Sequence, residues 1–326
     1  MTARRTRTMV CCLFSAALVT AAAACSSGGG NGSGSGSASS TTQITLGVAA
    51  GNGPANADLA QALGYFKAAG LNVSFKPLNG AGAEAIAGLD SGSITIVESN
   101  VVSVMQSAEH GINTPCFAGG VDFTDNMDTT LESVQSITQP SQLAGKSIGV
   151  ISTNSANTLM IDAYLEAHGV NYQSVHYVAT GVANTLPALQ SGSVQAAELV
   201  SPYSEQYAQS GGTLLQEDFG TVTKTPVFAC WTALKSWLGS NSAAAVKFVQ
   251  ALNKADAYYY AHPQQAAAAV SKLDSLPASA NLPTVTFKFT TSISGAQLQQ
   301  WITLGQKYGV LTGSIKLSQV YDPING

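Results

Sequence analysis

LDSGSITIVE, residues 89–98, returns in the same chain as LQSGSVQAAE, residues 189–198. Both stretches follow the pattern L-x-S-G-S-[I/V]-x-x-x-E, and they start 100 residues apart. The neighbouring sequence repeats in the same order: ITLGVAAGNGPAN (44–56) corresponds to KSIGVISTNSAN (146–157), and ALGYFKAAGLNVSF (62–75) corresponds to AYLEAHGVNYQSVHY (163–177). Three blocks at a nearly constant offset indicate that one structural unit occurs twice.

Each copy of the unit alternates between strand and helix patterns. A β-rich run comes first (ITLGVAA or KSIGVI), followed by a helix with apolar residues on one face, a second strand, a Gly-led helix and a third strand. Gly70 and Gly169 fit left-handed helix ends. Because strand–helix–strand units form parallel sheets with right-handed crossovers, the fold class is predicted as α/β, with two Rossmann-like lobes.

The C-terminal part supplies helices without a sheet of their own, so we expect it to return to the first lobe. Lobe 1 is predicted to comprise residues 43–130 and 223–326, and lobe 2 residues 131–222. The chain then passes between the lobes twice, near residues 129–134 and 220–225.

The N-terminal residues have the pattern of an export signal. Three arginines precede the apolar run CCLFSAALVTAAAA, which predicts a signal peptide over residues 1–24. Small residues before Cys25 resemble a bacterial lipobox, so Cys25 is predicted to be lipidated. Cleavage by ordinary signal peptidase after an A-x-A site is the alternative. Residues 26–42 are a flexible Gly/Ser linker with a typical span of roughly 23 Å, which would tether the protein to the membrane.

The charge pattern excludes several classes of function. After the signal peptide the chain holds 11 lysines, no arginine and 18 acidic residues, a formal charge of −7. No basic patch for nucleic acid is visible, and the bidentate arginine clamp for strong anions is lacking. We find no metal motif, no phosphate loop and no catalytic triad, and we therefore predict no cofactor, no metal and no enzymatic activity. Cys116 and Cys230 form either a disulfide or two buried thiols.

Three motifs resemble one family of binding proteins. ALGYFKAAGLNV resembles the element GYF-x-x-x-GL-x-V, LAGKSIGV (143–150) resembles L-x-GK-x-[IV]-x-V, and SGSVQAAELVSPY resembles G-x-V-D-A-A-x-x-x-x-PY. The family is that of the solute-binding proteins of ABC importers, in the branch for taurine, alkanesulfonates, nitrate and thiamine-pyrimidines (NMT1/THI5-like). The resemblance covers nearly all of residues 43–275. The chain departs from it at Thr95, Gln195 and Ser201, where the family often has acidic residues.

The resemblance implies a type II periplasmic-binding-protein fold, in which a small solute binds between the lobes and is passed to ABC permease subunits. It also implies that the strands holding Cys116 and Cys230 lie antiparallel and adjacent, so that a disulfide can form. The protein would act on the extracytoplasmic face of the bacterial membrane, as a monomer and without nucleic acid. A sensor that does not transport and a Thi5-type pyrimidine synthase are the alternative functions.

Ligands in parallel sheets bind beyond the carboxyl ends of the strands. Those ends carry small polar residues and one glutamate in each copy. The candidate ligand contacts are Asn52, Gly53, Asn56, Glu98, Ser99, Asn100, Phe123, Asp125, Thr153, Asn154, Ser155, Glu198, Ser201 and Tyr203. Asn and Ser before a helix also serve as caps, so that role stays open. Because carboxylates gather at this rim and arginine is missing, we expect a neutral or cationic nitrogen compound, such as a thiamine-pyrimidine, rather than a sulfonate or nitrate.

Overall fold

The strands of the two repeat copies form two separate sheets. The structure, a computed structural model, describes residues 41–49, 55–78, 82–122, 129–200, 203–217, 219–223, 227–270, 272 and 288–324. These residues belong to one compact unit of the chain, which comprises residues 40–326. The predicted signal peptide, Cys25 and most of the predicted linker lie outside them.

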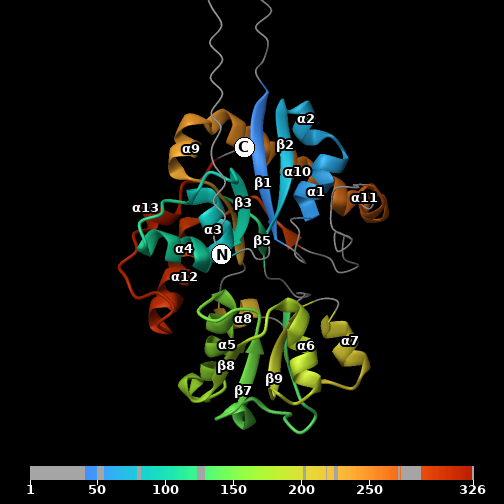
Figure 1. Ribbon diagram of the computed structural model, residues 1–326, viewed down its shortest axis with the longest axis vertical. Helices are drawn as coiled ribbons and strands as arrows, with labels where there is room; N and C mark the ends of the chain where they lie inside the picture. The colour runs from blue at the N-terminus through green and yellow to red at the C-terminus, as the bar shows by residue number, and fades with distance from the viewer. Residues whose placement is uncertain are drawn as a thin grey trace, which may run out of the picture. The chain divides into compact units, whose positions relative to one another are not determined.

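The first sheet has the strand order β2-β1-β3-β11-β4. Figure 1 labels β2, β1 and β3, which lie side by side in it. Its strands are β1 (Thr42–Ala49), β2 (Leu71–Leu78), β3 (Ile96–Asn100), β4 (Cys116–Gly119) and β11 (Ala229–Thr232). Strand β1 runs parallel to β2 and β3, whereas β11 runs antiparallel to both β3 and β4. The chain therefore completes this sheet with a strand that follows the whole second copy of the repeat.

The second sheet has the order β10-β6-β9-β7-β8. Its strands are β6 (Thr129–Ser133), β7 (Ser147–Val150), β8 (His176–Ala179), β9 (Ala196–Val200) and β10 (Thr213–Gln216). Strand β7 runs parallel to β8 and β9, and β6 runs antiparallel to β9 and β10. The segment at 129–133, expected as a connection between lobes, is thus itself a strand of the second sheet. A short third sheet pairs β5 (Val121–Asp122) with β12 (Lys288–Phe289).

Helices accompany the strands in the order that the sequence predicts. Around the first sheet they are α1 (Ala55–Ala62), α2 (Tyr65–Ala68), α3 (Ala83–Asp90) and α4 (Val101–Glu109). Between the strands of the second sheet lie η1 (Pro140–Leu143), α5 (Ala156–Ala167), η2 (Tyr172–Ser174), α6 (Val182–Gln190), α7 (Tyr203–Gln209) and α8 (Phe219–Thr223). The C-terminal helices are α9 (Lys235–Ser240), α10 (Ser242–Ala261), α11 (Pro263–Val270), α12 (Gly295–Lys307) and α13 (Leu317–Val320).

The two copies share their strand register, which confirms the duplication. Leu46 and Gly47 pair with β3 in the same way that Ile148 and Gly149 pair with β9. In both copies, a side chain just before the third strand accepts a hydrogen bond from a backbone N–H of the first strand. Thr95 Oγ1 accepts the Thr45 N–H at 3.1 Å, and Gln195 Oε1 accepts the Ser147 N–H at 3.1 Å. The α/β fold class predicted from the repeat is therefore confirmed.

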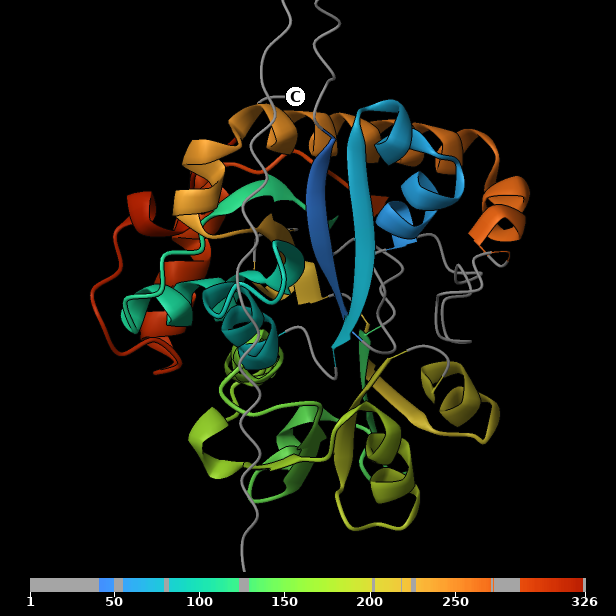
Figure 2. The same ribbon diagram turned by 45° about the horizontal axis from the view of Figure 1, so that its top comes forward.

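The long helix α10 and the shorter α1 and α2 cover one face of the first sheet (Figure 2). Phe248 of α10 stacks on Phe66 of α2, with ring centroids 5.2 Å apart, and meets the edge of Trp231 of β11 at 5.2 Å. All three aromatic side chains are fully buried, so they form the centre of this part of the core. C-terminal helices therefore do return to the first sheet.

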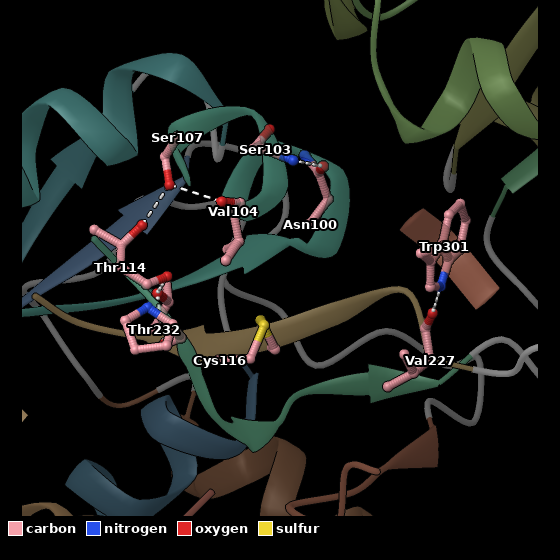
Figure 3. The surroundings of a disulfide bond; sticks show 11 residues. Asn100, Ser103, Val104, Ser107, Thr114, Cys116, Val227, Thr232 and Trp301 are labelled. Atoms are coloured by element: carbon pink, nitrogen blue, oxygen red, sulfur yellow. Dashed lines mark hydrogen bonds between the residues drawn. A yellow bond between two sulfur atoms is a disulfide. The ribbon is translucent and has the colours of Figure 1, made fainter. Parts of the chain in front are cut away.

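A disulfide joins β4 to β11 on the other face of the same sheet (Figure 3). Cys116 and Cys230 have their Cα atoms 5.6 Å apart, as a disulfide requires, and both are fully buried. Of the two alternatives left by the sequence, the disulfide is confirmed, and so is the antiparallel pairing of the two strands. Nearby, the Trp301 indole of α12 donates to the Val227 carbonyl at 2.6 Å. The end of the chain is thereby tied to the segment that leads into β11.

Helix α12 also contacts the helices of the second copy. The Lys307 ammonium pairs with the Glu166 carboxylate of α5, and the Tyr308 hydroxyl donates to the same carboxylate at 2.7 Å. The Tyr308 ring meets Tyr172 edge-on at 5.0 Å. Lys307 and Glu166 are largely exposed, so we expect their ion pair to add little stability, whereas the two tyrosines are partly buried against the core. Within the described ranges, no helix combines the length and the apolar character needed to span a bilayer.

Candidate functional site

Five of the predicted ligand contacts lie outside the described residues: Asn52, Gly53, Phe123, Asp125 and Ser201. The structure describes the other nine, and it places them in several different environments. The most informative are the two glutamates that end the repeated motif, Glu98 and Glu198, because they lie at equivalent places in β3 and β9.

Glu98 lies on the face of the first sheet that α10 covers. It is directly opposite Trp231 in the antiparallel pair β3–β11, so both side chains leave the sheet on the same side. Its carboxylate lies against Gly120, where even a Cβ atom would overlap it. Glycine at this position therefore leaves room for the Glu98 carboxylate at the end of β4.

Two further carboxylates lie near Glu98, and a carboxamide lies beside one of them, Asp256. Asp58 and Asn56 come from the start of α1, and Asp256 comes from α10. Asp58 is 2% exposed, Asn56 1% and Asp256 8%. We call Asn56, Asp58, Glu98 and Asp256 the lobe 1 acidic group.

Burial and mutual repulsion disfavour charge in the lobe 1 acidic group. Burial raises the pKa of Glu98 to about 8, and the nearby charges of Asp256 and Asp58 push it in the same direction. Burial raises the pKa of Asp58 to about 7. It also raises the pKa of Asp256 to about 7, while the neighbouring Asn56 carboxamide favours the charged form of Asp256. The group therefore takes up and releases protons near neutral pH.

Several polar atoms in this region lack a hydrogen-bond partner of good geometry. They are the Asn56 Nδ2 and Oδ1, the Asp58 Oδ1, the Asp256 Oδ1 and the Trp231 Nε1 atoms. Buried polar atoms are nearly always hydrogen-bonded, because an unmet donor or acceptor costs about 1–3 kcal/mol. The concentration of such atoms near Glu98 makes the lobe 1 acidic group a candidate ligand site.

Glu198, the equivalent residue in the second copy, finds its partners within the chain. It is 1% exposed, it accepts the Ile151 N–H at 3.2 Å, and it accepts a hydrogen bond from the Asn157 carboxamide. Burial raises the pKa of Glu198 to about 7, and these two hydrogen bonds oppose that rise. Asp162 is satisfied in a similar way, since the Tyr177 hydroxyl donates to it at 2.7 Å.

Asn100, Ser99 and Tyr203 have structural contacts of their own. Asn100 caps α4, where its side-chain oxygen accepts the Ser103 N–H at 2.9 Å. Ser99 is buried opposite Cys230, on the face of the sheet that Glu98 does not share. Tyr203 begins α7 and packs on the second copy's small core around Leu189. Contact of these residues with a ligand stays a prediction.

The loop before α5 lies next to α4. Its Asn154 has a left-handed backbone (φ 50°), and its carbonyl accepts a hydrogen bond from Gln106 of α4 at 2.8 Å. The neighbouring Thr153 is exposed, whereas Ser155 is buried and donates its hydroxyl to the Ser152 carbonyl at 2.9 Å. This contact brings the predicted site of the second copy next to a helix that begins at the end of β3. Ligand binding by these residues stays a prediction as well.

The sequence analysis missed Asp58 and Asp256. A signal for Asp58 was present, because the repeat aligns Asn56 with Asn157 and therefore aligns Asp58 with Leu159, a fully buried leucine. Asp256 lies on the apolar face of α10 between buried positions such as Leu252 and Tyr259. An acid at a position that the helical period assigns to the core is a sign of a special role. Across the residues that the structure describes, no three His, Cys, Asp or Glu side chains converge as they would around a metal ion.

Comparison with known proteins identifies the family and the fold of the chain. Residues 55–266 match the family model described as NMT1/THI5 like. None of the curated proteins compared with the chain matches it. The periplasmic aliphatic sulphonate-binding protein SsuA from Escherichia coli has a similar structure, with a TM-score of 0.68, 19% identity, and coverage of 86% of this chain and 92% of that one.

Two further solved structures are similar in the same way. The periplasmic nitrate-binding protein NrtA from Synechocystis PCC 6803 gives a TM-score of 0.68 at 14% identity, covering 86% of both chains. The zinc-bound ligand-binding component of an ABC-type import system from Staphylococcus aureus gives 0.69 at 14% identity, covering 86% of this chain and 97% of that one. At these identities the likeness shows the fold, which is the type II periplasmic-binding-protein fold.

Proposed function

Because the chain belongs to the NMT1/THI5-like family, we propose that it is a solute-binding protein that captures a small molecule between two lobes and delivers it to an ABC importer. The observation that carries this proposal is the pair of equivalent sheets, each with a glutamate and an asparagine from the repeat at its strand ends. Strand ends of this kind are where α/β proteins bind ligands.

The proposed mechanism is a change between two conformations. A solute that contacts residues of both lobes favours the closed form, and the permease would recognise that form. We propose the lobe boundaries given by the sequence, with residues 43–130 and 223–326 in lobe 1 and residues 131–222 in lobe 2. Capture and release need no covalent step, and the similar structures reported above are binding proteins by their titles.

We propose a neutral or cationic nitrogen compound as the solute, such as a thiamine-pyrimidine. The similar proteins from E. coli and Synechocystis bind a sulphonate and nitrate by their titles. In this chain, however, no arginine follows Arg7, and the buried side chains near β3 are acidic. Carboxylates repel an anion and attract a cation, and the effect grows where water is excluded.

A thermal-shift screen of the mature protein tests the function. The panel holds aminopyrimidines and other amines, neutral nitrogen heterocycles, taurine, alkanesulfonates and nitrate. A ligand at about 100 times its Kd adds about 2.7 kcal/mol to the free energy of unfolding, so a true solute gives a clear rise in Tm. A shift with an amine or a heterocycle supports the proposal. A shift with sulfonates alone overturns the proposed ligand class, and no shift with any solute overturns the binding role.

We propose that the protein works on the extracytoplasmic face of the cell membrane, held by a lipid on Cys25. The basis is the sequence of residues 1–42, and the similar proteins that are named as periplasmic agree with the compartment. Mass spectrometry of the native N-terminal peptide should find Cys25 acylated at the start of the mature chain. An unmodified N-terminus elsewhere would contradict the anchor without affecting the binding role.

A further inference from the structure

We propose that α5 and α12 form a reversible latch, in which Glu166 of the second repeat copy receives Lys307 and Tyr308, and that this latch sets the balance between the two conformations of the protein. The latch presupposes the two-conformation mechanism proposed above, on which this inference rests. It gives a regulatory role to side chains outside the predicted ligand site.

Helix α12 is anchored to the first sheet. Its Trp301 indole is fully buried and donates to the Val227 carbonyl at 2.6 Å, just before β11 (Figure 3). The helix also packs against α4, which begins at the end of β3. Lys307 ends α12 six residues after Trp301, roughly 9 Å further along the helix axis. The first sheet therefore fixes where Lys307 and Tyr308 lie.

Helix α5 is anchored to the second sheet. The Tyr164 hydroxyl donates to the Leu215 carbonyl of β10 at 3.1 Å, and Asp162 accepts from the Tyr177 hydroxyl of β8 at 2.7 Å. Glu166 is the residue before the last one of α5. The chain itself passes between the sheets elsewhere, before β6 and before β11. A contact between Glu166 and α12 therefore joins the two sheets at a place where the chain does not.

Four side chains meet at this contact. The Glu166 carboxylate pairs with the Lys307 ammonium and accepts the Tyr308 hydroxyl at 2.7 Å, and the Tyr308 ring meets Tyr172 edge-on at 5.0 Å. The hydrogen bonds from Lys307 and Tyr308 lower the pKa of Glu166, so this carboxylate is charged at neutral pH.

The equivalent helix of the first copy is joined to the C-terminal helices in a different way. Gly70 and Gly169 follow the equivalent helices α2 and α5. In α2, Phe66 stacks on Phe248 of α10, and both rings are fully buried. The ion pair of Glu166 with α12 is half exposed instead. We therefore expect the buried contact to persist and the exposed one to break and re-form in water.

The other end of α5 also touches an element of the first sheet. There the Gln106 side chain of α4 donates to the Asn154 carbonyl at 2.8 Å. Between the two ends, apolar side chains of α4, α5 and α12 belong to one core, which we expect to stay closed while the polar ends adjust. Glu166 lies roughly 16 Å along α5 from Ser155, a predicted ligand contact, so the latch acts at a distance from the site.

A weak contact is sufficient for this role. An exposed ion pair changes an equilibrium constant by up to about fivefold. Such a factor is small beside the stability of the fold, but it decides the ratio of two conformations that are close in free energy. A solute that binds one of them gains or loses affinity with that ratio. The latch therefore tunes affinity without contacting the solute.

Distance measurements between two spin labels test the latch in the mature protein, without any solute. Ala83→Cys in α3 and Ala183→Cys in α6 supply the labelling sites, because both residues are exposed and occupy equivalent places in the repeat. The disulfide keeps Cys116 and Cys230 from reacting, and Cys25→Ser removes the remaining thiol of the mature chain.

We expect the wild-type latch to populate the label separation that this structure gives. Lys307→Glu and Glu166→Lys each place like charges face to face, and each should lower the ratio of that population to the other by at least about threefold. Both substitutions together exchange the charges and should restore most of it. Lys254→Glu is the matched control, because Lys254 is an exposed lysine of α10 outside the latch, and it should change nothing.

Distances that neither single variant changes overturn the latch, and so does a charge exchange that shifts them as far as a single variant does. Circular dichroism shows whether each variant folds. Tyr308→Phe replaces one that does not, with a smaller shift in the same direction. If the distances do not respond while a solute raises the Tm in the screen above, the latch fails and the binding role stands. If they respond while no solute of the panel raises the Tm, the latch stands and the proposed function fails.

Discussion

Asn56 and Asn157 occupy equivalent places in the repeat but differ in what they contact. Asn157 donates to a carboxylate that is fully buried, whereas Asn56 is equally enclosed and lies beside Asp256 without a hydrogen bond of good geometry. A hydrogen bond to a charged group contributes about 1.5–3 kcal/mol, and its loss also leaves the buried acceptor unmet. The two residues should therefore contribute very differently to stability.

We predict that Asn157→Ala lowers the free energy of unfolding by about 2–3 kcal/mol and that Asn56→Ala changes it by less than about 1 kcal/mol. Removal of Asn157 takes a donor away from Glu198, while removal of Asn56 takes away two polar atoms that have no hydrogen bond of good geometry. Urea unfolding of the two variants and the wild type at pH 7, without added solute, measures the difference. Equal losses in both variants would contradict this account.

Single residues also mark how far the sequence could predict the site. The repeat located Glu98 and Glu198 at equivalent strand ends, as the structure has them. The repeat could not predict that Glu198 has hydrogen-bond donors within the chain while Glu98 lies among other acids. That difference depends on Asp256, which belongs to α10 and lies outside the repeat. Asp58 could have been predicted from the sequence as a site residue, because the second copy has Leu159 at the equivalent position.

At the scale of elements, the disulfide joins two strands that are far apart in the chain. Cys116 of β4 and Cys230 of β11 are separated by 114 residues, and that segment includes every strand of the second sheet. A disulfide stabilises chiefly by restricting the unfolded chain, and the effect grows slowly with the length of the loop it closes. This one encloses a whole copy of the repeat.

We predict that replacing both cysteines (Cys116→Ala with Cys230→Ala) lowers the free energy of unfolding by about 2–4 kcal/mol. Urea unfolding with and without dithiothreitol checks this, with the double variant as the control, because reductant should weaken the wild type alone. Thiol titration of the unfolded, non-reduced mature protein should also find neither cysteine free. A wild type that reductant leaves unchanged would refute the stabilising role.

Parallel strand–helix units were predictable from alternation alone, as β1–β3 and β7–β9 confirm. The antiparallel strands were harder to predict. The pairing of β11 with β4 followed from the resemblance to a family, and the strand at β6 was expected as a connection. Local sequence gives no direction to a strand whose partners come from another part of the chain, so hydrogen bonding within the folded sheet decides it.

For the molecule as a whole, both copies of the repeat and helix α10 contain acids that are harder to ionise than usual. Burial raises the pKa of Asp58, Asp162, Glu198 and Asp256 to about 7 and that of Glu98 to about 8. In the unfolded chain these acids have ordinary values near 4. Between these limits the native state holds protons that the unfolded state has lost. By linkage, such groups make the free energy of unfolding fall as the pH rises.

We therefore predict that the solute-free protein is more stable at pH 5 than at pH 8, and that it loses stability steadily as the pH rises between them. The contribution is fully present below the ordinary pKa values and is lost as the pH rises through the raised ones. Each group adds a slope of at most about 1.4 kcal/mol per pH unit, so a total loss of several kcal/mol is expected. Urea unfolding at pH 5, 6, 7 and 8 measures it. Asp162→Asn should flatten the curve by about one group, because it removes an acid that the fold keeps protonated. Stability that increases from pH 5 to pH 8 would show that these acids are ionised in the native protein, with partners of their own.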